Sequence, residues 1–128
     1  EFIKRLKNNL STVYGRGFEK TAKEFLCTRL KLTRAKRQWG KIPSAKKEES
    51  AYEIDLIGEN KETTFVFEFK WKELSYAQAK QILADLKEKT KHVPKLSKNY
   101  ELGIVAKKIS EKHLLKKEGF QAFDLEDF

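Results

Sequence analysis

Two acidic residues and a lysine occupy neighbouring stretches of alternating sequence and could together hold a divalent metal ion. Asp55 lies in the apolar-alternating stretch 52–57, and Glu68 and Lys70 lie in the stretch 64–71. Side chains alternate across a strand, so Glu68 and Lys70 share one face. If the two strands pair through the turn between them, Asp55 and Glu68 converge at one end. Carboxylate oxygens suit Mg²⁺ or Mn²⁺, so the sequence predicts a site for such an ion beside an ammonium group.

The prediction depends on the strand in which Glu68 and Lys70 lie, because an acidic residue two positions before a lysine is common in this chain. An acidic residue, any residue and then a lysine occur three times, at Glu59-x-Lys61, Glu68-x-Lys70 and Asp85-x-Lys87. Only Glu68 and Lys70 lie in an alternating apolar strand that follows another acidic strand. The simpler alternative is a surface ion pair on an edge strand with Asp55 solvated nearby.

Composition predicts one basic domain with a core of its own. The chain has 128 residues and a mass of 15.0 kDa, which suits a single domain. Hydrophobic residues make up 39%, including nine Phe and two Trp, and they exclude a wholly disordered chain. Lys and Arg number 28 against 19 Asp and Glu, a net charge of +9 that favours a polyanionic partner, either nucleic acid or an anionic membrane surface.

Cysteine usage and hydropathy indicate the cellular compartment in which we expect the protein. Cys27 is the single cysteine, which excludes an intrachain disulfide framework and a thiol cluster for zinc. No apolar run reaches the roughly 18 residues that span a bilayer, and no signal peptide opens the chain. We therefore expect a cytoplasmic protein with no membrane partner. The chain starts at Glu1 and has no Met, so we expect a fragment with a neighbouring domain missing.

The elements that must position these residues follow from apolar periodicity and turn residues. The sequence predicts helices at 1–13, 18–32, 74–91 and 110–117, and strands at 34–42, 52–57, 64–71, 102–106 and 120–125. A loop is expected at 43–50 and a turn at 58–61. In the strand 64–71, Phe65, Phe67 and Phe69 point one way and Val66 points with Glu68. Two strands flanking a helix predict a crossover, hence an α/β fold with a mixed sheet and helices on both faces.

The first helix of this core carries an acidic residue on its apolar side. Glu19 falls beside Leu26 and Leu30 on the helical projection of the helix at 18–32. A first-turn glutamate that favours the helix dipole and turns toward water is the simpler interpretation of this position alone.

A basic stretch surrounds an aromatic residue at the junction of this helix and the first strand. It comprises Arg29, Lys31, Arg34, Lys36, Arg37, Trp39 and Lys41. Clustered cations with an aromatic ring can bind phosphates and stack on an unpaired base. The alternative is the solvated rim of a charged protein. A second basic stretch comprises Lys87, Lys89, Lys91, Lys95 and Lys98, and His92 and His113 lack partners at metal-ligand spacing.

Three short patches resemble a known nuclease superfamily. Asp55, twelve intervening residues and Glu68-Phe69-Lys70 resemble the core motif of the PD-(D/E)XK nucleases, and Glu19 matches the helical glutamate of many members. The predicted order of elements resembles that superfamily's restriction-endonuclease-like αβββαβ core. Ile54 replaces the proline that gives the superfamily its name.

A narrower resemblance covers residues 14–106. It is to the C-terminal nuclease-like domain of archaeal AAA-type ATPases, through Tyr14-Gly15-Arg16-Gly17-Phe18-Glu19, Glu53-Ile54-Asp55-Leu56 and Glu68-Phe69-Lys70-Trp71. The resemblance implies that residues 14–128 form the nuclease-like domain and that the helix at 1–13 is a remnant of the connection to an upstream domain.

The resemblance also implies roles for individual residues. Asp55 and Glu68 would ligate Mg²⁺ or Mn²⁺ together with the backbone carbonyl of Phe69, and Glu19 would bind through water or position a second ion. Lys70 would orient or deprotonate the attacking water. The implied reaction is phosphodiester hydrolysis that leaves 5′-phosphate and 3′-hydroxyl ends. Secondary candidates are Glu53, Gln78 and Gln81, which are more simply a rim charge and surface residues of a helix.

The functional expectation is therefore a Mg²⁺-dependent deoxyribonuclease domain, the C-terminal module of a larger ATPase. Its expected partners are DNA and the upstream ATPase domain, and a homodimer would suit an enzyme that cuts two strands. The alternatives are a catalytically inactive DNA-binding module of that ATPase, a Holliday-junction-resolvase-like nuclease, and a protein-interaction domain that docks the missing neighbour.

Overall fold

A computed structural model of the chain describes residues 16–42 and 51–128, and the predicted helix at 1–13 and loop at 43–50 lie outside them. The elements in order are α2 (Arg16–Arg29), β1 (Arg34–Lys41), β2 (Ala51–Glu59), β3 (Thr64–Leu74), α3 (Tyr76–Thr90), β4 (Tyr100–Ile109), α4 (Lys112–Lys117), β5 (Gln121–Phe123) and the 3₁₀ helix η2 (Leu125–Asp127). In these two ranges no helix has both the length and the apolar character that crossing a membrane requires.

The five strands form one mixed sheet in the order β1-β2-β3-β4-β5. β1, β2 and β3 pair antiparallel, whereas β3, β4 and β5 pair parallel. α3 connects the parallel strands β3 and β4, so it crosses over one face of the sheet. The α/β class, the mixed sheet and the predicted order helix, three strands, helix, strand are confirmed.

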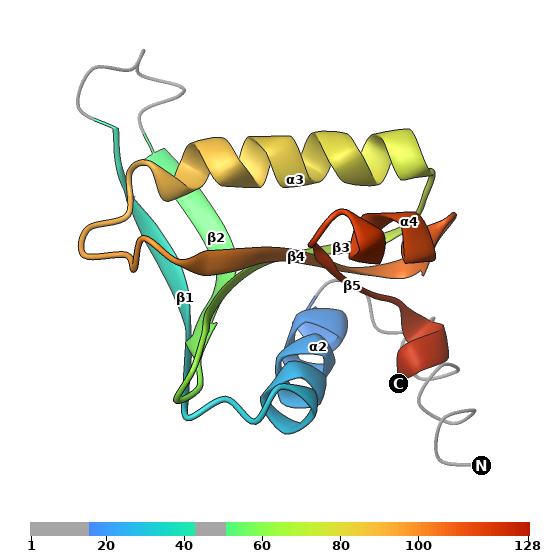
Figure 1. The fold of residues 1–128 in the computed structure, drawn as a ribbon, viewed down its shortest axis with the longest axis horizontal. Helices are drawn as coiled ribbons and strands as arrows, with labels where there is room; N and C mark the ends of the chain where they lie inside the picture. The colour runs from blue at the N-terminus through green and yellow to red at the C-terminus, as the bar shows by residue number, and fades with distance from the viewer. Residues whose placement is uncertain (1–15, 43–50) are drawn as a thin grey trace.

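Helices cover both faces of the sheet, and each covers its own part of the core (Figure 1). Val66 packs with Leu83 and Leu86 of α3 in one cluster, while Phe67 packs with Leu26 of α2 in the other. The alternation predicted for β3 is confirmed, because Phe65, Phe67 and Phe69 all belong to the α2 side. The residues on either side of Glu68, Phe67 and Phe69, thus both pack in the α2 layer, while Glu68 points to the opposite face of the strand.

Three predicted boundaries differ from the structure for local reasons. α2 ends at Arg29 because Lys31 has a left-handed φ of 54° and the side-chain amide of Asn60 donates to the Leu30 carbonyl at 3.0 Å. The turn lies at 60–63, where Asn60 accepts from the Thr63 amide at 2.8 Å, and β2 therefore runs on to Glu59.

The apolar face of α3 differs from the one that the sequence predicts for the helix at 74–91, which comprises Ala77, Ile82, Leu83 and Leu86. In the structure Ala77 is exposed, and Ala79 is buried in its place. The helix starts at Tyr76 with Ser75 as its N-cap, and Gln78 completes a capping box. This start directs Ala79, Leu83 and Leu86 toward the sheet.

Candidate functional site

A β-bulge in β2 places Asp55. The register between β1 and β2 shifts between Lys36 and Gln38, because β2 supplies two residues, Asp55 and Leu56, where β1 supplies one. Ile54 therefore packs in the α3 cluster and Leu56 in the α2 cluster. Regular alternation along the stretch 52–57 predicts Ile54 and Leu56 on one face, opposite Asp55. That prediction is wrong, since the bulge interrupts the alternation at Asp55.

The pairing of β2 with β3 stops directly before the two carboxylates. The last paired residues are Leu56 and Phe67, so Asp55 and Glu68 come next and face each other where the ladder has ended. The Asp55 carboxylate accepts a hydrogen bond from the Phe69 amide at 2.8 Å. A side chain thus satisfies a backbone donor of β3 that the neighbouring strand does not reach.

A pocket of about 290 Å³ opens at this point. It is lined by Glu19, Arg37, Glu53, Asp55, Glu68, Phe69, Lys70 and Lys89. The structure therefore brings all five residues of the predicted metal and catalytic set into one pocket. Glu19 reaches it from the first turn of α2, half-buried and not turned away into solvent. Glu53 lies at the same pocket in an ion pair with Arg37.

The charge of Glu68 is poorly solvated. Burial raises the pKa of the Glu68 carboxyl to about 7, and the neighbouring Asp55 carboxylate adds to this rise while Lys89 opposes it. The ammonium nitrogen of Lys89 lies 2.7 Å from Oε2 of Glu68. The ammonium of Lys89 thus pairs with Glu68, while the neighbouring Asp55 carboxylate accepts from the Phe69 amide.

Lys89 is the site residue that the sequence prediction misses. The sequence places it only in a general basic stretch at the end of α3, yet its side chain enters the pocket. One signal is present: Lys89 follows the buried Leu86 by three residues and precedes the buried Thr90, so it borders the buried stripe of the helix.

The donor chemistry of the pocket fits a hard divalent cation. Carboxylates from Glu19, Asp55 and Glu68 and the Phe69 carbonyl offer oxygen atoms, which Mg²⁺ and Mn²⁺ prefer. In the observed arrangement Glu68 binds Lys89, and among the residues that the structure describes no three acidic, His or Cys side chains are grouped closely enough to hold an ion. An ion held by Glu68 would lie beside the ammonium of Lys89, which already pairs with that carboxylate.

The two glutamines considered as secondary candidates have structural partners on α3. Gln78 accepts a hydrogen bond from the Ser75 amide at 2.9 Å in the capping box. Gln81 donates to Asp85 at 2.9 Å on the exposed side of the helix. Neither lines the pocket.

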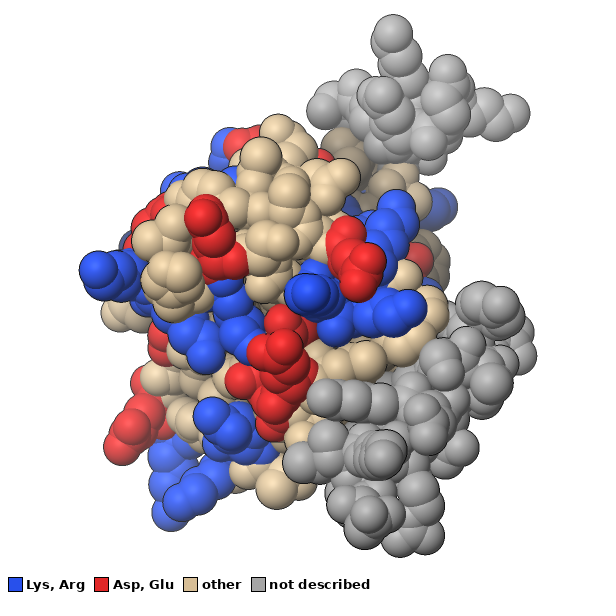
Figure 2. All heavy atoms as spheres, turned by 90° about the vertical axis from the view of Figure 1, so that its right-hand side faces the viewer, with Lys and Arg blue, Asp and Glu red and all other residues tan. Residues whose placement is uncertain are grey.

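The predicted basic stretch is divided among different surfaces. Arg37 lines the carboxylate pocket, and Trp39, 67% exposed, lies with it in an adjoining hollow. Arg34 and Lys36 line a separate groove with the loop at 93–97. The guanidinium of Arg29 lies 5.7 Å from the centre of the Phe123 ring. Figure 2 shows that lysines and arginines are interleaved with acidic residues on the side that carries α4, so the positive charge is not gathered there.

Comparison with known proteins identifies the family of the chain. Residues 1–82 match DUF234, described as "Archaea bacterial proteins of unknown function". Uncharacterized protein MJECL04 of Methanocaldococcus jannaschii is 36% identical over 129 residues, which cover 98% of this chain and 28% of the relative. The chain thus corresponds to less than a third of that relative's length.

Two solved structures are also similar. A repair endonuclease from Pyrococcus abyssi has a TM-score of 0.42 at 20% identity over 88% of this chain and 47% of that one. The EndoMS–dsDNA2 complex has a TM-score of 0.41 at 18% identity, over 87% and 45% of the respective chains. Because the family match includes 82 of its 128 residues, this chain belongs to the DUF234 family.

Proposed function

We propose that this chain is a metal-dependent deoxyribonuclease domain. The observation that supports it best is the position of Asp55 and Glu68, which face each other beyond the last paired residues of β2 and β3. Lys70 and the Phe69 carbonyl line the same pocket. Two carboxylates and a carbonyl could ligate Mg²⁺ or Mn²⁺, and the ammonium of Lys70 would lie beside the ion. Such a site could hydrolyse a phosphodiester bond.

Each residue has a distinct task in this proposal. Asp55, Glu68 and the Phe69 carbonyl would hold the ion, and Glu19 would contribute from the first turn of α2. The bound ion supplies an activated water and stabilises the charge that develops on the phosphate. Lys70 would orient that water and offset the same charge.

Arg37 and Trp39 are the best-placed contacts for DNA. Both border the carboxylate pocket or the hollow next to it, so a phosphate bound by Arg37 would lie close to the reacting one. The exposed Trp39 ring could then stack on an unpaired base. The remaining basic residues of the predicted set, which would contribute salt-dependent affinity from more distant surfaces, are Arg29, Lys31, Arg34, Lys36 and Lys41.

We also propose that the chain is one domain of a larger protein and that its substrate includes branched DNA. The relative is more than three times as long as the chain, which is compatible with a domain of a larger protein. The resemblance to the nuclease-like domains of archaeal AAA-type ATPases is the reason to propose an upstream ATPase domain, and a homodimer would suit an enzyme that cuts two strands. Four-way junctions, as for a Holliday-junction resolvase, are the first branched substrate to test.

The test is cleavage of plasmid and four-way-junction DNA with Mg²⁺ or Mn²⁺. We expect Asp55→Asn and Glu68→Gln each to lower the cleavage rate at least about a hundredfold, because each removes a ligand of the ion. Glu73→Gln is the matched control, since Glu73 is an exposed acidic residue of the same strand. Cleavage that persists in both site variants, or in the presence of a chelator, would refute the proposal.

A second candidate is a DNA-binding module without catalytic activity. The observation in its favour is the Glu68–Lys89 pair, in which an ammonium already neutralises one of the expected metal ligands. This candidate predicts that the chain binds DNA without cleaving it under any divalent metal, and that Asp55→Asn leaves DNA affinity unchanged. A gel-shift titration run alongside the cleavage assay separates the two candidates.

A further inference from the structure

The contact between Lys89 and Glu68 joins α3 to the floor of the pocket. Lys89 lies in the last turn of α3, and its ammonium nitrogen is 2.7 Å from Oε2 of Glu68. The Glu68 side chain is only 8% exposed, whereas that of Lys89 is 32% exposed. The carboxylate is therefore held in place by the strand, while the ammonium reaches it from the rim along a flexible four-carbon stem.

A buried and a half-buried carboxylate that face each other favour a positive charge nearby. Asp55 and Glu68 follow the last paired residues of their strands and open into the same pocket. Without a cation their mutual repulsion and their desolvation would both be unfavourable. Of the ion pairs in the described part of the chain, the one that reaches Glu68 is made by Lys89.

The ammonium of Lys89 and a divalent cation would compete for the same carboxylate of Glu68. A metal ion bound there would bring two positive charges to within a few ångströms of Lys89, where repulsion at this short range is strong. Because Lys89 is at the rim, its side chain can swing toward solvent without moving the helix.

We propose that Lys89 is the resident counter-ion of the Asp55–Glu68 pair, which a divalent metal ion must displace from Glu68, and that Lys89 thereby lowers the metal affinity of the site. This inference depends on the proposed function, since it takes the pocket to be the metal site. The role of Lys89 would explain why the oxygen ligands of the pocket suit a metal ion although they are not grouped closely enough to hold one. Lys89 acts in it as a competing cation, and Lys70 remains beside the reacting groups.

The experiment is calorimetric titration of the chain with Mn²⁺ alone, without DNA. The variants are Lys89→Gln, Lys89→Arg and the control Lys91→Gln. Lys91 lies two residues away at the same end of α3 and pairs with Glu88 at 2.9 Å, so the control removes the same charge from the same region. Asp55→Asn identifies binding at the proposed site.

We expect Lys89→Gln to bind Mn²⁺ about tenfold more tightly than wild type, because the competing charge is gone. Lys91→Gln should change affinity by less than about twofold, since a solvated charge is screened. Lys89→Arg keeps the charge and should remain near wild type. Circular dichroism melting would confirm that the variants are folded, as expected for a side chain at the rim.

Two results would overturn the inference, and they differ in what they say of the proposed function. Equal or weaker binding by Lys89→Gln, with binding abolished by Asp55→Asn, would refute the role of Lys89 and leave the metal site intact. Absence of Mn²⁺ binding in both wild type and Lys89→Gln, or binding that survives Asp55→Asn, would refute the metal site and the role of Lys89 together.

Discussion

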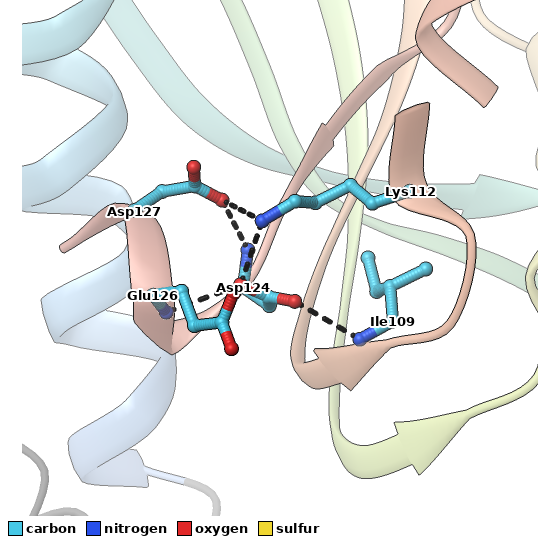
Figure 3. Close-up of polar contacts among 5 residues, drawn as sticks. All are labelled: Ile109, Lys112, Asp124, Glu126 and Asp127. Atoms are coloured by element: carbon cyan, nitrogen blue, oxygen red, sulfur yellow. Dashed lines mark hydrogen bonds and ion pairs between the residues drawn. The ribbon is translucent and has the colours of Figure 1, made fainter. Parts of the chain in front are cut away.

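Two regions of this molecule set a lysine against a pair of carboxylates, and they differ in what the lysine achieves. In the pocket, Lys89 contacts Glu68 beside Asp55. Near the C-terminal end of the described chain, Lys112 lies 2.9 Å from Asp124 and 2.8 Å from Asp127 (Figure 3). Each region places a lysine beside two carboxylates, and the two regions differ in the hydrogen bonds that those carboxylates accept.

The C-terminal cluster, formed by Lys112, Asp124 and Asp127, has hydrogen-bond donors for its carboxylates among its own and neighbouring residues. Besides Lys112, Asp124 accepts from the amide of Ile109 at 3.1 Å and from that of Glu126 at 3.1 Å, and its own amide donates to Asp127 at 2.9 Å. These bonds tie the end of β4 to the helical turn η2 (Figure 3). The polar atoms of this buried carboxylate therefore have hydrogen-bond partners on both oxygens.

The pKa values of the two regions move in opposite directions. Burial alone would raise the pKa of Asp127, but the hydrogen bonds from Lys112 and from the Asp124 amide outweigh it and lower that pKa. In the pocket, burial and the Asp55 carboxylate outweigh Lys89 and raise the pKa of Glu68 to about 7. The C-terminal cluster therefore serves stability, whereas the pocket retains a deficit of positive charge that a metal ion would remove.

The largest effect that distinguishes the two regions is expected when Asp124 is replaced. We expect Asp124→Ala to lower the free energy of unfolding by about 3 kcal/mol, because it leaves the Ile109 amide and part of the Lys112 charge buried without a partner. Urea unfolding measures the change. Glu126→Ala, on an exposed neighbour in η2, should cost less than about 0.5 kcal/mol. A loss of similar size in both variants would contradict the structural role of the cluster.

Removing the carboxylate charge in the pocket should stabilise the fold, whereas removing Asp124 should destabilise it. Glu68 has a pKa of about 7 in the fold against 4.5 ordinarily, so the folded state favours its protonated form. The stability this provides is present below pH 4.5 and is lost as the pH rises through 7. Glu68→Gln mimics the protonated form. In chelator, we expect it to raise the free energy of unfolding by about 2 kcal/mol at pH 8 and by almost nothing at pH 4.

Thermal or urea unfolding of wild type and Glu68→Gln at both pH values tests this expectation. Glu73→Gln, exposed on the same strand, is the control and should show no such pH dependence. A destabilising effect of Glu68→Gln at pH 8 would mean that the Lys89 pair already satisfies the charge of Glu68, and the contrast between the two regions would disappear.

The smallest expected effect concerns Asp127. Its folded pKa is lowered from 3.8, so its charged form stabilises the fold above pH 3.8, and that contribution is lost as the pH falls through the folded pKa. Asp127→Asn should therefore cost about 1 kcal/mol at pH 6 and progressively less toward pH 2. Unfolding curves across that range check it, and a cost that does not depend on pH would show that packing, not charge, explains the effect.

Local sequence determined most of the elements. The alternation around Val66 and the three phenylalanines of β3 correctly assigned the two faces of that strand, because the period of a strand is a property of the backbone. The short turn between β2 and β3 likewise predicted that Asp55 and Glu68 converge, since two strands joined so closely pair with each other. Apolar periodicity and turn residues also predicted the mixed α/β fold, since they mark the elements, and two strands that flank a helix imply a crossover.

The tertiary structure decided the features that depend on two elements at once. The bulge that sends Ile54 and Leu56 to opposite layers arises from the fit of β2 to β1, and alternation along one strand cannot reveal it. Lys89 is 21 residues from Glu68, and only the crossover of α3 over the sheet brings its ammonium to that carboxylate. Sequence alone determines which groups a strand or helix presents, whereas the packing of the elements decides which of those groups meet.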